Sequence, residues 1–227
     1  MNEQVTRLLI VRHGQTDGNA QGRSQGRRDV PLNDTGRAQA ASTGKLVAAL
    51  GPVAVYSSTS SRARETAGAI ATPLGLEVQA DERLQEVDHG HLDGMAGDEM
   101  RAQYGDFIRR WREEDPTDIA IPGGESLGQA QVRMLAAVRD ICAAHRGETV
   151  AVVSHNLALR TFICYALGVP IRAWRVFRID LASLSIVEVR DGDRWAVVGL
   201  NEQCHLTSPA PSPLEDGRAS EASTPGS

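Results

Sequence analysis

Two histidines follow two short apolar runs at the same spacing. His13 stands two residues after the run at 8–11, and His155 stands two residues after the run at 150–153. Four apolar residues bounded by polar ones predict a strand buried on both faces, and α/β sheets bind ligands at the carboxyl ends of their parallel strands. If the two strands are parallel neighbours, both imidazoles lie at one edge of the sheet. A neutral imidazole there is a competent nucleophile.

Two arginines belong to the same predicted edge. Arg12 precedes His13, and Arg62 begins a predicted helix after the strand at 53–56, where backbone N–H groups also attract anions. Together with His155 these residues form a cationic pocket, which suits a phosphoryl group because its transfer depends mainly on neutralising charge. We therefore predict that His13 takes a phosphoryl group from a substrate.

The leaving oxygen of such a substrate needs a proton, and a carboxylic acid with a raised pKa could supply it. The acid-rich loop at 82–93 is the obvious source. The same loop contains a His89-x-His91 pair flanked by aspartates, which could also be interpreted as a set of metal ligands. The arginines of the pocket would repel a cation, so we expect no metal and no cofactor.

The rest of the chain must supply the elements that position these residues. Alternating strand and helix patterns followed by a hairpin favour a three-layer α/β/α sandwich with a mostly parallel central sheet and a C-terminal antiparallel hairpin. We expect strands at 8–11, 53–56 and 150–153, an extended piece at 76–78, helices at 38–50, 62–71, 99–113, 126–145 and 157–167, and a hairpin at 183–190 and 194–200.

Two local details complete this prediction. A hydroxyl from the serine-rich stretch 57–61 should cap the helix that begins near Arg62. In the helix at 126–145 we expect one apolar stripe. It would be formed by Val132, Leu135, Val138 and Cys142.

Composition limits the classes of partner. The 227 residues carry a net charge of −5 and are 41% hydrophobic, which suits one sizeable core and gives no bulk attraction to nucleic acid or an anionic membrane. The three cysteines form no Cys-x-x-Cys motif, and no signal-peptide pattern opens the chain, so we expect a cytoplasmic protein. Residues 1–206 should form the domain. Residues 207–227, rich in Pro and Ser, should be a disordered tail.

Five short motifs, in this order along residues 8–206, resemble the histidine phosphatase (phosphoglycerate mutase-like) superfamily. They are Arg12-His13-Gly14, Ser57-Ser58 with Arg62-Ala63, Glu86 with Gly90, Gly124-Glu125-Ser126, and Val153-Ser154-His155. Within that family the similarity is greatest to metal-independent phosphoserine phosphatases, through residues 86–90, 107–111, 123–127, 166–169 and 201–206.

The resemblance implies roles that spacing alone does not give. His13 would be the phosphorylated nucleophile and Glu86 the proton donor. The phosphate ligands would be Arg12, Arg62, Asn19 and His155, with Gln25 and Gly26 lining the entrance and Asn156 binding substrate. For phosphoserine we expect the substrate carboxylate to be bound by His89, on the loop that delivers the acid, and by His205, on a terminal segment folded over the mouth.

Several alternatives stay open at this point. The substrate could be another small phosphomonoester, such as a phosphoglycerate derivative or a ribazole phosphate, and the chain could act as a phosphoglycerate mutase. A non-catalytic phosphate-binding module is the rival from another class, although a binder has no use for a positioned acid. We expect a small phosphorylated metabolite as partner, and a homodimer is left open.

Overall fold

Strand β1 (Val5–Arg12) is buried on both faces, as its apolar run predicts. Leu8 and Ile10 belong to one hydrophobic cluster, whereas Leu9 and Val11 belong to another on the opposite face. A strand with this alternation must lie in the middle of a sheet that is covered on both sides.

The sheet of this computed structural model, which describes residues 4–190 and 193–206, has six strands in the order β3-β2-β4-β1-β5-β6. Strands β3, β2, β4 and β1 run parallel, and β5 and β6 add an antiparallel hairpin at one edge. The fold class expected from the sequence is confirmed. The other strands are β2 (Ala54–Ser57), β3 (Val78–Ala80), β4 (Thr149–Ser154), β5 (Leu184–Arg190) and β6 (Arg194–Glu202).

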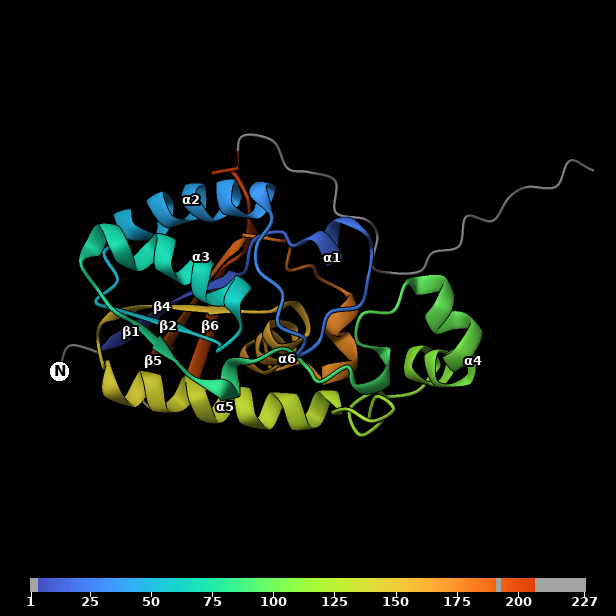
Figure 1. The fold of residues 1–227 in the computed structure, drawn as a ribbon. Coiled ribbons are helices and arrows are strands. Elements are labelled where there is room, and N and C mark those ends of the chain that lie inside the picture. Colours follow the sequence, from blue (N-terminus) through green and yellow to red (C-terminus); the bar gives the residue numbers. More distant parts are fainter. Residues whose placement is uncertain (1–3, 191–192, 207–227) are drawn as a thin grey trace, which may run out of the picture.

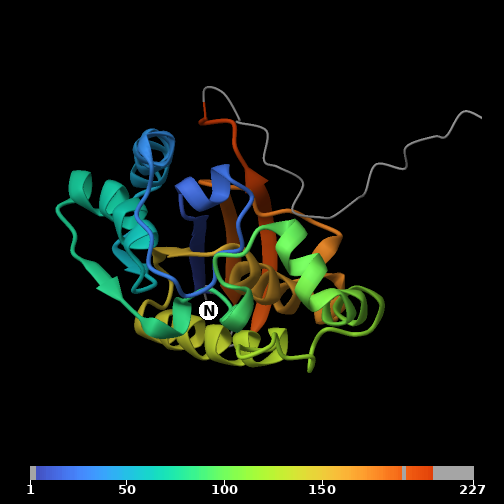
Figure 2. The ribbon, with the colours of Figure 1, turned by 45° about the vertical axis from the view of Figure 1, so that its right-hand side comes forward.

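Helices cover both faces of this sheet. Figures 1 and 2 show α2 and α3 together on one side and α5 on the other, where α6 also packs. Helix α4 lies beyond the carboxyl edge of the parallel strands, over a third hydrophobic cluster. The helices are α1 (Asp17–Ala20), α2 (Asp34–Ala49), α3 (Ser61–Ala71), α4 (Gly97–Glu113), α5 (Leu127–Ala144) and α6 (Asn156–Ala166).

The apolar stripe predicted for α5 is partly wrong. Leu135 and Val138 are buried, but Val132 is 71% exposed. The face that α5 turns to the sheet runs through Met134 and Ile141, and the helical period carries Val132 to the opposite side. The prediction from hydrophobicity alone therefore included one residue, Val132, that lies outside the buried face of the helix.

Strand β3 also differs from its prediction, because pairing with β2 begins at Val78 and not at 76. A 3-10 turn over Thr72–Leu74 and the left-handed Gly75 end the preceding helix, and the chain needs two more residues to reach the sheet edge. The predicted hairpin turn at 191–192 and the predicted tail at 207–227 lie outside the described residues. Within the described residues, the helices are all too short or too polar to cross a membrane.

Candidate active site

The parallel pairing of β1 with β4 brings the two histidines together. Arg12 stands opposite Ser154 in the register, and the backbone N–H of His13 donates to the Ser154 carbonyl at 3.1 Å. Each histidine follows its strand end directly, so their rings meet with centroids 5.0 Å apart. The expectation that the two runs are parallel neighbours is confirmed.

The hydrogen bonds of His13 fix which ring nitrogen carries the proton. Its Nδ1 lies 2.7 Å from the Gly14 carbonyl oxygen, which can only accept, so Nδ1 carries the proton. Its Nε2 then bears the lone pair, and it accepts from Arg62 Nε at 3.3 Å. Burial, followed by the charges of Arg62 and Arg12, holds the pKa of His13 well below 6.5. The imidazole is therefore neutral, with a lone pair facing the pocket.

His155 is oriented by two serine hydroxyls. Its Nε2 lies 2.6 Å from Ser58 Oγ and 3.3 Å from Ser60 Oγ. Its Nδ1 is buried and has no hydrogen-bond partner among the described residues. Burial, then the charge of Arg62, lowers the pKa of His155 well below 6.5. The tautomer with its proton on Nδ1 would accept these hydroxyls at Nε2 and present an N–H to an anion.

The prediction that a serine hydroxyl caps α3 is wrong, because the hydroxyl at the cap position contacts His155. Ser60 occupies the N-cap position, but its side chain makes no capping hydrogen bond. Its hydroxyl instead lies between Ser58 Oγ and the His155 ring. The hydroxyls of Ser58 and Ser60 thus contact the His155 imidazole, and the Ser60 hydroxyl does not cap the helix.

Arg62 and Arg12 are both buried, and backbone carbonyls solvate their guanidinium groups. Arg62 Nη2 donates to the Gly26 carbonyl at 2.8 Å and Nη1 to the Arg28 carbonyl at 2.9 Å. Arg12 Nη1 donates to the Ile179 carbonyl at 2.8 Å. Neutral acceptors thereby fix each guanidinium in place.

Glu86 is buried, and its carboxylate lies at the N-terminus of α6. It accepts backbone N–H groups from Val87 at 2.9 Å, from Ala158 at 2.9 Å and from Leu157 at 3.2 Å. These donors include two of the amides with which α6 begins, which have no partner within the helix. The Glu86 carboxyl group is therefore held at the start of α6, the helix that directly follows His155.

The residues expected at the entrance, Asn19, Gln25 and Gly26, lie in the segment between β1 and α2. Gly26 contacts Arg62 through its carbonyl, and there is no space for a side chain on it because the His89 backbone lies too close. Asn19 Oδ1 accepts from the Thr16 N–H and caps α1, while Thr16 Oγ1 lies 2.7 Å from Gln25 Oε1. In this structure Asn19 and Gln25 therefore bind the loop to itself.

His89 and Asn156 lie near the pocket, and His205 contacts α2 and Ala182, whose N–H donates to the His13 carbonyl. His89 packs against Gly26, and its Nδ1 lies 2.6 Å from Ser24 Oγ. Asn156 is the first residue of α6, next to His155. The Nε2 of His205 lies 3.0 Å from Thr43 Oγ1 in α2 and 3.0 Å from the Ala182 carbonyl, so the terminal segment is bound to α2.

The possible metal ligands of the acid-rich loop have other partners. Asp93 accepts the backbone N–H groups of Gly26 and Arg28, and Asp88 accepts that of Gly90. Throughout residues 4–190 and 193–206, no three His, Cys, Asp or Glu side chains converge on a point that could hold a metal ion.

Comparison with known proteins agrees with this geometry. The family model of the histidine phosphatase superfamily (branch 1) matches residues 8–203. The chain belongs to the histidine phosphatase superfamily. It is accordingly a phosphomonoester hydrolase, and its substrate is a small phosphorylated compound.

Three similar proteins indicate the range of this family. Phosphoserine phosphatase 1 of Hydrogenobacter thermophilus is 34% identical over 202 residues, covering 89% of this chain and 95% of the relative. A probable phosphoglycerate mutase, GpmB, of Salmonella paratyphi C is 32% identical, covering 91% and 97%. The solved structure of a mycobacterial glucosyl-3-phosphoglycerate phosphatase superposes with a TM-score of 0.80 at 29% identity, covering 88% and 100%.

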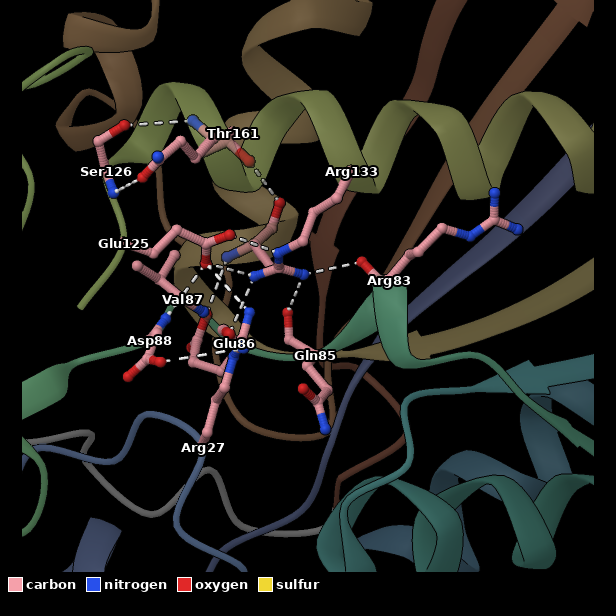
Figure 3. Close-up of polar contacts among 12 residues, drawn as sticks. Arg27, Arg83, Gln85, Glu86, Val87, Asp88, Glu125, Ser126, Arg133 and Thr161 are labelled. Atoms are coloured by element: carbon pink, nitrogen blue, oxygen red, sulfur yellow. Dashed lines mark hydrogen bonds and ion pairs between the residues drawn. The ribbon is translucent and has the colours of Figure 1, made fainter.

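Sequence reasoning missed two sets of residues in this histidine phosphatase. It expected one hydroxyl of the stretch 57–61 to cap a helix and gave no sign that the hydroxyls of Ser58 and Ser60 contact His155. It assigned no role to the Glu125 motif, and it did not mention Arg133, which binds Glu125 and the loop that carries Glu86 (Figure 3). In both cases the sequence shows a cluster of polar residues but not its three-dimensional partner.

The lowered histidine pKa values predict how stability depends on pH. As pH falls through about 6.5, the unfolded chain binds protons that folded His13 and His155 do not, so stability is lost. Each histidine contributes up to about 1.4 kcal/mol per pH unit between pH 6.5 and its folded-state pKa. We expect His13→Asn and His155→Asn each to reduce the slope of unfolding free energy against pH, measured by urea titration from about pH 5 to 7.

The slope, and not the absolute stability, is compared in this test. His91→Asn, which removes an exposed imidazole from the acid-rich loop, is the control. Slopes that stay the same in both pocket variants would contradict the burial of neutral imidazoles.

Proposed function

We propose that this enzyme hydrolyses its substrate through a phosphohistidine on His13, with Glu86 as proton donor. The observation that supports this most directly is the orientation of His13. Its Nδ1–H is committed to Gly14, and its Nε2 lone pair points toward Arg62. A neutral, oriented nucleophile beside fixed cations is what phosphoryl transfer from an anionic ester requires.

The first half-reaction follows from this arrangement. The substrate's phosphoryl oxygens contact Arg12, Arg62 and the Nδ1–H of His155, which together neutralise their charge. His13 Nε2 attacks phosphorus, and the bond from phosphorus to the ester oxygen breaks. Glu86 gives its proton to that oxygen, so the alcohol leaves in neutral form.

The second half-reaction returns the enzyme to its starting state. A water molecule attacks the phosphohistidine, the P–N bond breaks, and the Glu86 carboxylate takes the proton that the water loses. The products are inorganic phosphate and a neutral His13. Asn19, Gln25, Gly26 and Asn156 contact the substrate from the rim of the pocket in this proposal.

For the physiological substrate we favour phosphoserine. The similarity to a phosphoserine phosphatase supports this choice, as does His89, which lies beside Gly26 at the entrance. The carboxylate of phosphoserine is a few bonds from its phosphate, within reach of this imidazole. The relatives named for phosphoglycerate chemistry make phosphoglycerate esters the main alternative, with transfer of phosphate to phosphoglycerate as the sign of mutase activity.

The role of Glu86 is tested by changing the leaving group. Glu86→Gln should lower kcat/KM for an alkyl phosphate by about 10²- to 10⁴-fold, because an alkoxide leaves only when protonated. The same variant should lower kcat/KM for p-nitrophenyl phosphate less than about ten-fold, since nitrophenolate leaves without a proton. The ratio kcat/KM reports the first half-reaction, whereas kcat also contains the hydrolysis of the phosphohistidine, in which Glu86 acts for both substrates. Steady-state kinetics on both substrates, with Glu82→Gln as an exposed control on the same loop, give the comparison. Equal losses on both substrates would exclude Glu86 as the acid.

The choice of phosphoserine is tested at His89. A charge-assisted contact to the substrate carboxylate is worth about 1.5–3 kcal/mol, or about ten- to a hundred-fold in specificity. His89→Ala should therefore lower kcat/KM for phosphoserine by that factor and leave p-nitrophenyl phosphate nearly unchanged. His91→Ala, two residues further on, is the matched control. If the wild-type enzyme prefers 3-phosphoglycerate to phosphoserine, the substrate is misassigned.

A further inference from the structure

The motif Gly123-Gly124-Glu125-Ser126 lies outside the phosphate pocket, but it contacts the loop that carries the acid. The N–H of Glu125 donates to the Asp88 carbonyl at 3.0 Å. A side-chain carbon on Gly124 would collide with that same carbonyl, so glycine is needed for the two backbones to approach. Glu125 Oε2 accepts the N–H of Asp88 at 3.2 Å. The motif therefore packs against Asp88, two residues after Glu86 in the chain.

Arg133 of α5 joins this motif to the acid-bearing loop. Its Nε and Nη2 donate to the two carboxylate oxygens of Glu125, at 2.7 and 2.8 Å. Its Nη1 donates to the carbonyls of Arg83 and Gln85, at 2.7 and 2.6 Å, and its Nη2 to that of Glu86, at 2.9 Å. Figure 3 shows the guanidinium between these groups. All five N–H donors of Arg133 can thus be used.

The loop has few other ways to satisfy these carbonyls. Residues 85–88 belong to neither helix nor strand, and the remaining carbonyl of the series, that of Leu84, accepts from Ser154 Oγ at 2.7 Å. Side chains from α5 and β4 therefore bind four successive carbonyls of the loop, at 83–86. Glu86 is fixed through its backbone by Arg133 and through its carboxylate by the amides of α6.

We propose that Arg133, aligned by Glu125, is a positioning residue for the acid Glu86. The pair is largely buried, with side-chain exposures of 16% for Arg133 and 12% for Glu125, and its geometry is bidentate, so it holds one arrangement. The pair sets the place of the Glu86 carboxyl relative to the leaving oxygen without touching the substrate. This inference rests on the proposed function, because it requires Glu86 to be the proton donor.

The test compares two substrates within each variant. Arg133→Met should lower kcat/KM for an alkyl phosphate, phosphoserine, by about ten- to a hundred-fold, since misplacing an acid by about an ångström costs about that factor. It should lower kcat/KM for p-nitrophenyl phosphate by less than about three-fold. The affinity for inorganic phosphate should stay within about two-fold. Arg133→Lys and Glu125→Gln should shift the same ratio in the same direction by a smaller factor.

Arg83→Met is the matched control. Arg83 lies on the same loop, but its guanidinium binds Asp81 and Asp140 and points away from Glu86 in Figure 3. This variant should leave the alkyl-to-aryl ratio unchanged. Because both rates are measured on one preparation, a loss of folded protein lowers them equally and cannot change the ratio.

The outcomes separate this inference from the proposed function. If Glu86→Gln changes the alkyl-to-aryl ratio but Arg133→Met, Arg133→Lys and Glu125→Gln leave it unchanged, the positioning role is wrong and the acid role stands. Equal losses on both substrates in the Arg133 and Glu125 variants would also contradict the positioning role, because they would show that the pair supports only the fold. If Glu86→Gln does not change the ratio, the acid role and the positioning role are both wrong.

Discussion

Two buried guanidinium groups beside two buried imidazoles are the constraint on which the rest of the site depends. Such a pocket is tolerable only if both imidazoles remain neutral, and burial together with the arginine charges lowers their pKa values accordingly. Carbonyl oxygens solvate Arg62 and Arg12 without cancelling their charge. The pocket therefore combines neutral imidazoles with buried cations, an arrangement that suits a phosphoryl group.

The remaining geometry follows from keeping these groups in register. Parallel pairing of β1 with β4 sets the distance between the histidines, and the Gly14 carbonyl chooses the tautomer of His13. The acid comes from an irregular loop, where no ladder of backbone hydrogen bonds can fix it. Instead, the Arg133 side chain binds the Glu86 carbonyl, and the first amides of α6 bind the Glu86 carboxyl group. The sheet thus holds the proposed nucleophile, while the Arg133–Glu125 pair holds the loop of the proposed acid.

Much of this could be predicted from the sequence because its signals are local. Apolar runs of four residues identify the central strands, and the identical offset of His13 and His155 from those runs identifies the edge where they meet. The buried face of α5 was harder, since Val132 is apolar yet exposed, and only the packing against the sheet decides which face turns inward. Hydrophobic type is a weaker guide than the register of a helix against its neighbours.

Long-range partners were not predictable in the same way. Ser60 is a good capping residue by type, and nothing in its neighbourhood shows that a histidine 95 residues later takes its hydroxyl. His205 follows the last strand, and nothing near it in the sequence shows that its Nε2 meets the hydroxyl of Thr43 in α2. Arg133 has no motif around it, and its importance emerges only from the carbonyls that it contacts. Each of these contacts depends on how segments distant in sequence meet.

The central claim is that His13 carries the phosphoryl group between the two half-reactions. It is tested most directly by quenching the wild-type enzyme during turnover and locating the covalent phosphate by mass spectrometry at alkaline pH. We predict an acid-labile phosphate on His13, absent from His13→Ala. An acid-stable phosphate on a serine, such as Ser58 beside His155, would contradict this mechanism.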